Sequence, residues 1–186
     1  MIKKTLWFLA AAALFSATAA ADPLREYAQP ERARVWAISD GGLFLDEARK
    51  PRRAITLAGW HWASWPYACA PAIAVGPRGE VVITSNVLPV LWKIDPETLG
   101  GSVHRLELDA DNDKDVGFSG LVYSERDRAY IAVSESHGTL WRIDPLLRRA
   151  QKIALSAPVR GACAVSMQTV NLAPDQRLAY VIGGKK

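Results

Sequence analysis

The chain has 186 residues, of which 49% are hydrophobic and 23% charged, and its formal net charge at pH 7 is +4. So many apolar residues with so small a net charge exclude an intrinsically disordered chain, and a count of two cysteines excludes a disulfide-dense miniprotein. The length fits one domain of ordinary size, in which seven tryptophans must be divided between a core and a site.

Residues 1–21 have the pattern of a secretory signal peptide. Lys3 and Lys4 give a positive start, residues 6–15 are apolar, and residues 16–21 are small. The apolar run is shorter than the roughly 20 residues that a membrane span needs, so we expect a periplasmic protein with no membrane span in its mature form.

The charge of the mature chain is small and dispersed. Removing Lys3 and Lys4 from 23 basic residues leaves 21 against 19 acidic residues, a net charge of +2. The densest basic group is short and comprises Arg49, Lys50, Arg52 and Arg53. Export and the absence of a long basic stripe argue against nucleic-acid binding.

Residues 22–33 are interpreted as a linker, and residues 34–186 as a series of short strands separated by Gly, Pro, Asp and Asn turns. The first unit begins with its second strand, and Leu45-Asp46 occupies the place that Ile94-Asp95 occupies in the next unit. The predicted strands are 34–39, 42–46 and 54–58; then 70–76, 80–86, 90–95 and 102–108; then 118–124, 129–134, 138–144 and 150–156; then 165–173 and 178–183.

The strands belong to an internal repeat. The sequence LWKIDP at 91–96 recurs as LWRIDP at 140–145, 49 residues further on. Four short strands repeating at about 40–50 residues are typical of a β-propeller blade. We therefore predict an all-β propeller with four-stranded antiparallel blades of about 50 residues, of which this chain holds about three.

Three blades do not close a ring, since propellers close with roughly four to eight. We expect either self-association, or another chain that completes the propeller, or a longer propeller of which this sequence is a piece. In each case an isolated copy is expected to expose apolar blade faces and strand edges.

Longer stretches resemble known propeller repeats. Residues 90–108 and 173–184 resemble YVTN-type repeats, and residues 79–96 and 116–145 resemble the gluconolactonase, strictosidine synthase and paraoxonase type of six-bladed propeller. The resemblance covers most of residues 34–184. The gluconolactonase type implies an alternative function, a calcium-dependent lactonase or esterase whose metal, held by residues such as Asn86, Glu135 and Asp115, polarises an ester carbonyl.

Chemically distinctive side chains gather in the loops of one propeller face. These loops connect the second strand of a blade to its third strand, and the last strand of each blade to the next blade. The turns of the opposite face are plain polar turns. The aromatic loop, residues 59–71, either plugs the channel and packs between blades or forms a ligand platform. Trp36, Trp92 and Trp141 are instead expected in the core. The candidate ligand or partner residues are Trp60, His61, Trp62, Trp65, Tyr67, Asn86, Glu135, His137 and Arg160.

Two other features of this face suggest a metal site and a disulfide, and for each the sequence allows a second interpretation. Asp109, Asp111, Asp113 and Asp115 alternate along a loop, either as ligands for Ca²⁺ or as a solvated turn. Cys69 and Cys163 either form a disulfide in an oxidising compartment or stay as two buried thiols.

No complete catalytic set, phosphate loop or nucleophile motif is present, so the sequence favours a binding protein over an enzyme. We predict an exported binding or scaffold module that engages a protein or a small molecule through the loop face. No cofactor is expected except calcium, if the acidic loop binds it.

Overall fold

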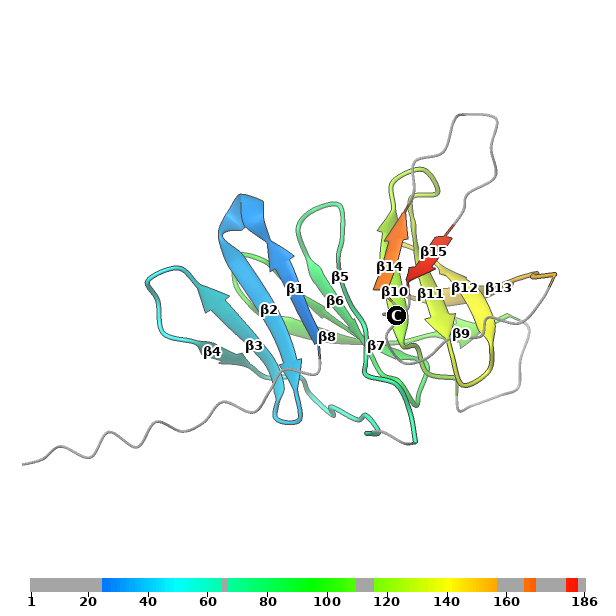
Figure 1. Ribbon diagram of the computed structural model, residues 1–186, viewed down its shortest axis with the longest axis horizontal. Helices are drawn as coiled ribbons and strands as arrows, with labels where there is room; N and C mark the ends of the chain where they lie inside the picture. The colour runs from blue at the N-terminus through cyan, green and yellow to red at the C-terminus, as the bar shows by residue number, and fades with distance from the viewer. Residues whose placement is uncertain (1–24, 65–66, 110–115, 157–165, 170–179, 184–186) are drawn as a thin grey trace, which may run out of the picture.

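The computed structural model describes residues 25–64, 67–109, 116–156, 166–169 and 180–183 (Figure 1). In these residues every regular element is a strand except one 3-10 helix, Pro30–Arg32. The predicted signal peptide lies outside the described residues. No helix in the described part of the chain is long and apolar enough to cross a membrane.

The strands form four sheets that follow one another along the chain (Figure 1). The first sheet contains β1 (Arg25–Gln29), β2 (Arg34–Ser39), β3 (Gly42–Glu47) and β4 (Arg53–Ile55). The second contains β5 (Ile73–Val75), β6 (Val81–Thr84), β7 (Val90–Ile94) and β8 (Gly101–Arg105). The third contains β10 (Gly120–Ser124), β11 (Ala129–Ser134), β12 (Thr139–Ile143) and β13 (Arg149–Ile153), with β9 (Glu107–Leu108) added at its edge. The fourth contains β14 (Ser166–Thr169) and β15 (Tyr180–Gly183).

The sheets are placed side by side through their first strands. Strand β1 lies next to β5, β5 next to β10, and β10 next to β14. Within each of the first three sheets, successive strands pair in antiparallel fashion from the first to the fourth. This arrangement of four-stranded antiparallel sheets confirms the all-β prediction and the blade-like units.

The first sheet differs from its prediction in two respects. Residues 25–29, predicted as part of a linker, form β1 and pair with β2. Three of the five residues of β1 are exposed, so the strand shows no apolar alternation by which it could be found. In addition, Leu45 packs in the interface with the second sheet, where Ile94 packs from the opposite side. The proposed equivalence of Leu45 and Ile94 is therefore wrong, because the two residues lie on opposite faces of their sheets.

The apolar core lies between successive sheets. One cluster joins the first and second sheets around Trp36 and Trp92, and another joins the second and third around Trp141. All three indoles are at most 2% exposed, and their ring nitrogens donate to Gln29 Oε1, Ala58 O and Thr139 Oγ1 respectively. Their predicted core role is confirmed, since each buries a large ring and satisfies its one donor.

On the outward face of the first sheet, a basic side chain lies over an aromatic ring. Strand alternation places Phe44 on the side away from the buried Leu43 and Leu45. The Arg52 guanidinium lies 5.0 Å from the centre of the half-buried Phe44 ring, and Arg52 also pairs with Asp46 at 3.3 Å. The large hydrophobic side chains exposed in the described residues are Tyr27, Tyr67, Val103, Leu146 and Leu155.

The fourth strand of the second sheet is divided. The run predicted as one strand at 102–108 becomes β8 and β9, separated by Leu106, whose side chain is buried and whose N–H donates to Pro89 O. Strand β9 then pairs in parallel with β13, so one connection joins the second sheet to the edge of the third.

Candidate functional site

The loops at one end of the sheets meet, as the sequence predicted for a propeller face. The Ser85 hydroxyl donates to His61 O at 3.0 Å, and the Phe118 N–H donates to Ser85 O at 2.8 Å. The buried Thr84 hydroxyl donates to Phe118 O at 2.5 Å. These bonds join the aromatic loop, the β6–β7 turn and the loop before β10 into one surface, the loop face.

Asn86 fixes the aromatic loop in place. Its carboxamide oxygen accepts from Ala63 N at 2.9 Å, and its amide nitrogen donates to Ala63 O and Cys69 O, both at 2.7 Å. The side chain is 5% exposed. Asn86 was predicted to contact a ligand; in the structure its carboxamide bonds to the backbone of the loop, and the ligand contact stays a prediction.

Gly117 permits this packing. A Cβ atom at position 117 would overlap the backbone of Asn86 and Val87. The loop before β10 therefore approaches the β6–β7 turn more closely than any residue with a side chain would allow.

The aromatic loop divides between core and surface. The Trp60 ring packs edge-on against Trp92, with centroids 5.0 Å apart, and its buried ring nitrogen has no hydrogen-bond partner among the described residues. Trp62 is half-buried and His61 is exposed, with His61 Nδ1 2.7 Å from Gly59 O. Tyr67 is 85% exposed. Trp60 thus packs between two sheets, as one interpretation predicted, whereas a ligand platform formed by the exposed residues stays a prediction; Trp65 lies outside the described residues.

Three sheets contribute to a polar cluster that includes Cys69, two residues after Tyr67, and that we call the axial mouth. It consists of Arg25 at the start of β1, Cys69 and Ala70 before β5, and Glu135 after β11. The Arg25 guanidinium donates to Ala70 O at 3.4 Å, and the Cys69 sulfur, which is disulfide-bonded, contacts the Glu135 carboxylate. Burial raises the pKa of Glu135, while the charge of Arg25 opposes the rise. Burial likewise lowers the pKa of Arg25, and the charge of Glu135 opposes that change.

Sequence reasoning found Glu135 but not Arg25. Glu135 follows a predicted strand on the predicted face, whereas Arg25 belongs to a strand that the sequence did not reveal. His137, also predicted for this face, is exposed, and its Nδ1 lies 3.1 Å from Ser134 Oγ and 2.9 Å from Ser136 Oγ. It therefore interacts within its own turn.

Several predicted site residues fall outside the described residues: Arg160, Cys163, Asp111, Asp113 and Asp115. Asp109 is described, and its Oδ1 accepts from Lys152 N at 3.0 Å. In the described ranges, no group of three or more His, Cys, Asp or Glu side chains is arranged to hold a metal ion. The calcium hypothesis stays a prediction, and Cys163, the other cysteine of the sequence and so the expected partner of the disulfide-bonded Cys69, lies outside the described residues.

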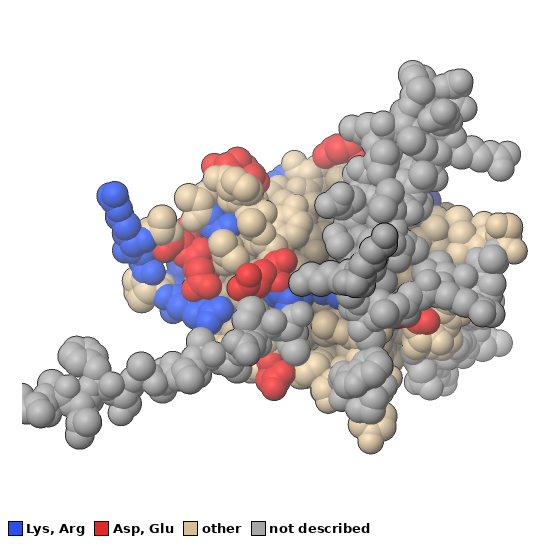
Figure 2. All heavy atoms as spheres, in the orientation of Figure 1, with Lys and Arg blue, Asp and Glu red and all other residues tan. Residues whose placement is uncertain are grey.

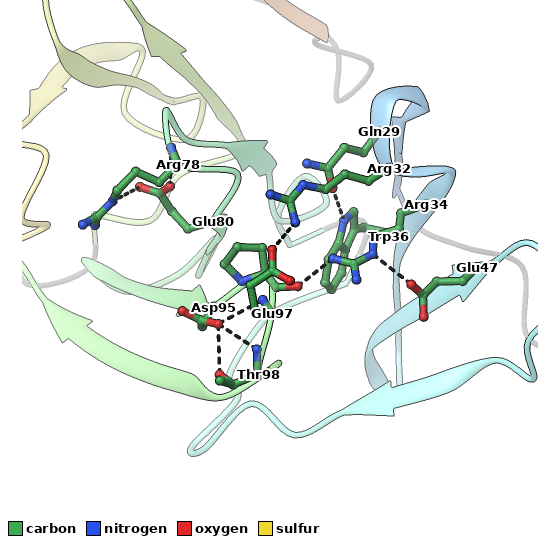
Figure 3. Close-up of polar contacts among 11 residues, drawn as sticks. Gln29, Arg32, Arg34, Trp36, Glu47, Arg78, Glu80, Asp95, Glu97 and Thr98 are labelled. Carbon is green, nitrogen blue, oxygen red and sulfur yellow. Dashed lines mark hydrogen bonds and ion pairs between the residues drawn. The ribbon is translucent and has the colours of Figure 1, made fainter.

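The opposite end of the sheets carries a polar network that the sequence presented as plain turns (Figure 3). Arg34 donates to Glu47 Oε1 at 3.0 Å and to Pro96 O at 2.6 Å, so one guanidinium connects the first sheet to the second. Arg32 pairs with Glu97 at 2.6 Å across the same boundary. Partial burial opposes ionisation of Glu47, but hydrogen bonds from Arg34 and its other cationic neighbours outweigh it and hold the pKa of Glu47 below its ordinary value.

A second polar contact at this end joins the second and third sheets. The buried Glu80 carboxylate accepts from Arg78 N at 2.9 Å and from the Tyr130 hydroxyl at 3.3 Å. Burial and the nearby Glu80 charge raise the pKa of Tyr130. A side chain at Gly76 would overlap this pair. These residues bind one sheet to the next, which is a structural role.

Comparison with known proteins identifies the fold only. No family profile matches the chain. No curated protein sequence matches it. A catalytically inactive virginiamycin B lyase from Staphylococcus aureus, solved with quinupristin, is similar in structure, with a TM-score of 0.55, 14% sequence identity, and coverage of 74% of this chain and 42% of the lyase. The selenomethionine form of that lyase aligns with a TM-score of 0.39 at 16% identity, covering 68% of this chain and 36% of the other. The chain thus spans less than half the length of these structures, and the first likeness shows a β-propeller-like fold.

Proposed function

We propose that the chain is an exported binding module that holds a small molecule or a segment of another protein against its loop face. The single observation that carries the proposal is the placement of Tyr67. Its side chain is 85% exposed, and Ala63 and Cys69, on either side of it in the sequence, are both bonded to the Asn86 carboxamide. A large ring on a loop held in this way binds with little further loss of conformational entropy.

The axial mouth supplies the polar half of the proposed site. Arg25 and Glu135 come from different sheets, and burial disfavours the charged form of each. A ligand group that hydrogen-bonds to the guanidinium or the carboxylate would compensate part of this desolvation. We infer a ligand with an apolar or aromatic face for Tyr67 and a hydrogen-bonding group for Arg25 and Glu135.

A thermal-shift screen with a fragment and short-peptide library tests the proposal. Compounds that raise the Tm of the wild type should lose their effect on Tyr67→Ala and have a reduced effect on Glu135→Gln. Leu146→Ala is the matched control, because Leu146 is 61% exposed but lies in a turn at the opposite end of the sheets. The proposal fails if no compound acts on the wild type, or if the effects are the same in Tyr67→Ala and Leu146→Ala.

Export is a separate part of the proposal and has its own test. Expression in a Gram-negative host should give a periplasmic protein that begins near residue 20 or 22 by mass spectrometry. An intact product that begins at Met1 and stays in the cytoplasm would contradict export without affecting the binding proposal.

We also infer that the repeats are of the YVTN or gluconolactonase type and that further blades, from a second copy or another chain, complete a ring. The side-by-side placement of β1, β5, β10 and β14 supports this inference. Sedimentation of the purified chain should reveal association, and a stable folded monomer would count against completion by a second copy.

A further inference from the structure

The turn between β3 and β4 carries the densest basic group of the chain at the far end of the first sheet from the loop face. We call this group the basic turn; it consists of Arg49, Lys50, Arg52 and Arg53. Figure 2 shows Lys and Arg side chains gathered at this extremity of the molecule. Arg49 has a φ of 62°, and the Lys50 N–H donates to Glu47 O at 3.1 Å, so the backbone is tightly turned.

The basic turn has more positive charge than its own carboxylates neutralise. Glu47, whose side chain is only 9% exposed, pairs with Arg34 at 3.0 Å, with Lys50 at 3.3 Å and with Arg53. Asp46 pairs with Arg52 at 3.3 Å. The four cations of the turn together with Arg34 face these two carboxylates, which leaves an excess of three positive charges.

The excess charge is accessible to a partner. The side chains of Lys50, Arg53 and Arg52 are 61%, 42% and 32% exposed respectively. The corresponding turns of the other two sheets are different: the second contains Glu97 beside Arg32, and in the third Arg149 pairs with Glu107. Among the described turns of the three four-stranded sheets, the excess is therefore confined to this one.

We propose that the basic turn is an electrostatic docking site for an anionic phospholipid surface. A turn at the end of a sheet with partly exposed cations suits a flat array of headgroups. Each basic residue near such a surface strengthens binding about fivefold. Single-stranded nucleic acid is a poorer match, because its binding uses exposed aromatic rings beside the cations, and the ring in this region, Phe44, lies beneath Arg52.

Docking through this turn leaves the proposed binding site free. The basic turn joins the third and fourth strands of the first sheet, whereas the loop face contains the connections at the opposite strand ends. A chain held at a membrane by the basic turn would present Tyr67 and the axial mouth away from the lipid.

Vesicle co-sedimentation with the full chain tests the proposal. We expect binding to phosphatidylcholine vesicles that contain about 30% phosphatidylglycerol, none to phosphatidylcholine alone, and loss of binding at about 1 M salt, where the screening length is about 3 Å. The variant R49S/K50S should bind about 30-fold more weakly, since two charges are removed. It retains the pairs of Glu47 with Arg34 and Arg53, so it should fold, and Arg49→Ser alone serves if it does not.

The matched control is R148S/R149S, which removes the same charge from the corresponding turn of the third sheet. Its binding should stay within about twofold of the wild type. The proposal is overturned if the wild type does not bind the anionic vesicles, or if both double variants lose binding equally. It is also overturned if a DNA duplex binds through the basic turn while the vesicles do not.

Discussion

Asn86 offers the sharpest test of how the aromatic loop is held. Its carboxamide makes three hydrogen bonds to the loop backbone, and each bond of this kind contributes about 1 kcal/mol to stability. Asn86→Ala removes all three and should lower the free energy of unfolding by about 3 kcal/mol. For a chain of this length each kcal/mol corresponds to about 2–4 °C, so the Tm should fall by about 6–12 °C.

The location of the destabilisation caused by Asn86→Ala is as informative as its magnitude. Amide hydrogen exchange should accelerate at residues 62–64 and 67–70 more than in the strands of the second sheet, because the loop loses the hydrogen bonds that hold it while the core packing is unchanged. Asn86→Asp should be destabilised more than Asn86→Ala at neutral pH, since one carboxylate oxygen would face Ala63 O and Cys69 O. The difference should shrink near pH 4, where a protonated carboxyl group donates again.

Ser102→Ala is the control, because the Ser102 hydroxyl makes exposed bonds to Lys93 O and His104 and its loss should cost less than about 0.5 kcal/mol. The reasoning is refuted if Asn86→Ala costs under about 1 kcal/mol and leaves exchange in the loop unchanged. The carboxamide would then be free for another role, including the ligand contact first expected of it.

Three further predictions concern backbone contact and pH. Gly117→Ala should destabilise the chain by more than about 2 kcal/mol in urea unfolding, because its Cβ would overlap the backbone of Asn86, whereas Gly100→Ala, whose Cβ would meet only a flexible hydroxyl, should cost much less. The pKa of Glu135 is raised in the folded state, so ionisation of Glu135 lowers the stability of the fold as the pH rises above the ordinary glutamate pKa of about 4.3. Glu135→Gln should therefore raise the Tm at pH 7 and lose that advantage below about pH 4. Backbone N–H groups hold the pKa of Asp95 below its ordinary value, so its carboxylate stabilises the fold above about pH 3.9. That contribution disappears as pH falls through the lowered pKa. The loss of Tm in Asp95→Asn, measured by thermal unfolding, should therefore be largest at neutral pH and vanish in acid.

The repeat made most of the fold predictable from sequence. Trp92 and Trp141 stand at equivalent points of matched strands, and both are core residues because a sheet packed between two others has apolar side chains on both faces. Strand β1 could not be found in this way, because its pairing with β2 depends on backbone bonds and leaves most of its side chains exposed.

The candidate site was predictable as a place but less so as a set of roles. Loop connectivity correctly brought Asn86 and the aromatic loop together, yet composition did not distinguish the half-buried Trp60, which packs on the core, from the exposed Tyr67. Arg25 meets the residues near Glu135 through contacts that are distant in sequence, for which the local pattern contains no signal.

Strand β9 imposes an order of events on a newly made chain. Glu107 pairs beside Arg149, 42 residues further along, whereas β5 to β8 pair only with their immediate successors. At a synthesis rate of about 5–20 residues per second, the second sheet is complete about 2–8 s before the partner of β9 emerges. For that interval the backbone groups of β9 lack their partner strand, and the parallel pairing at this edge of the third sheet forms only once β13 has been made.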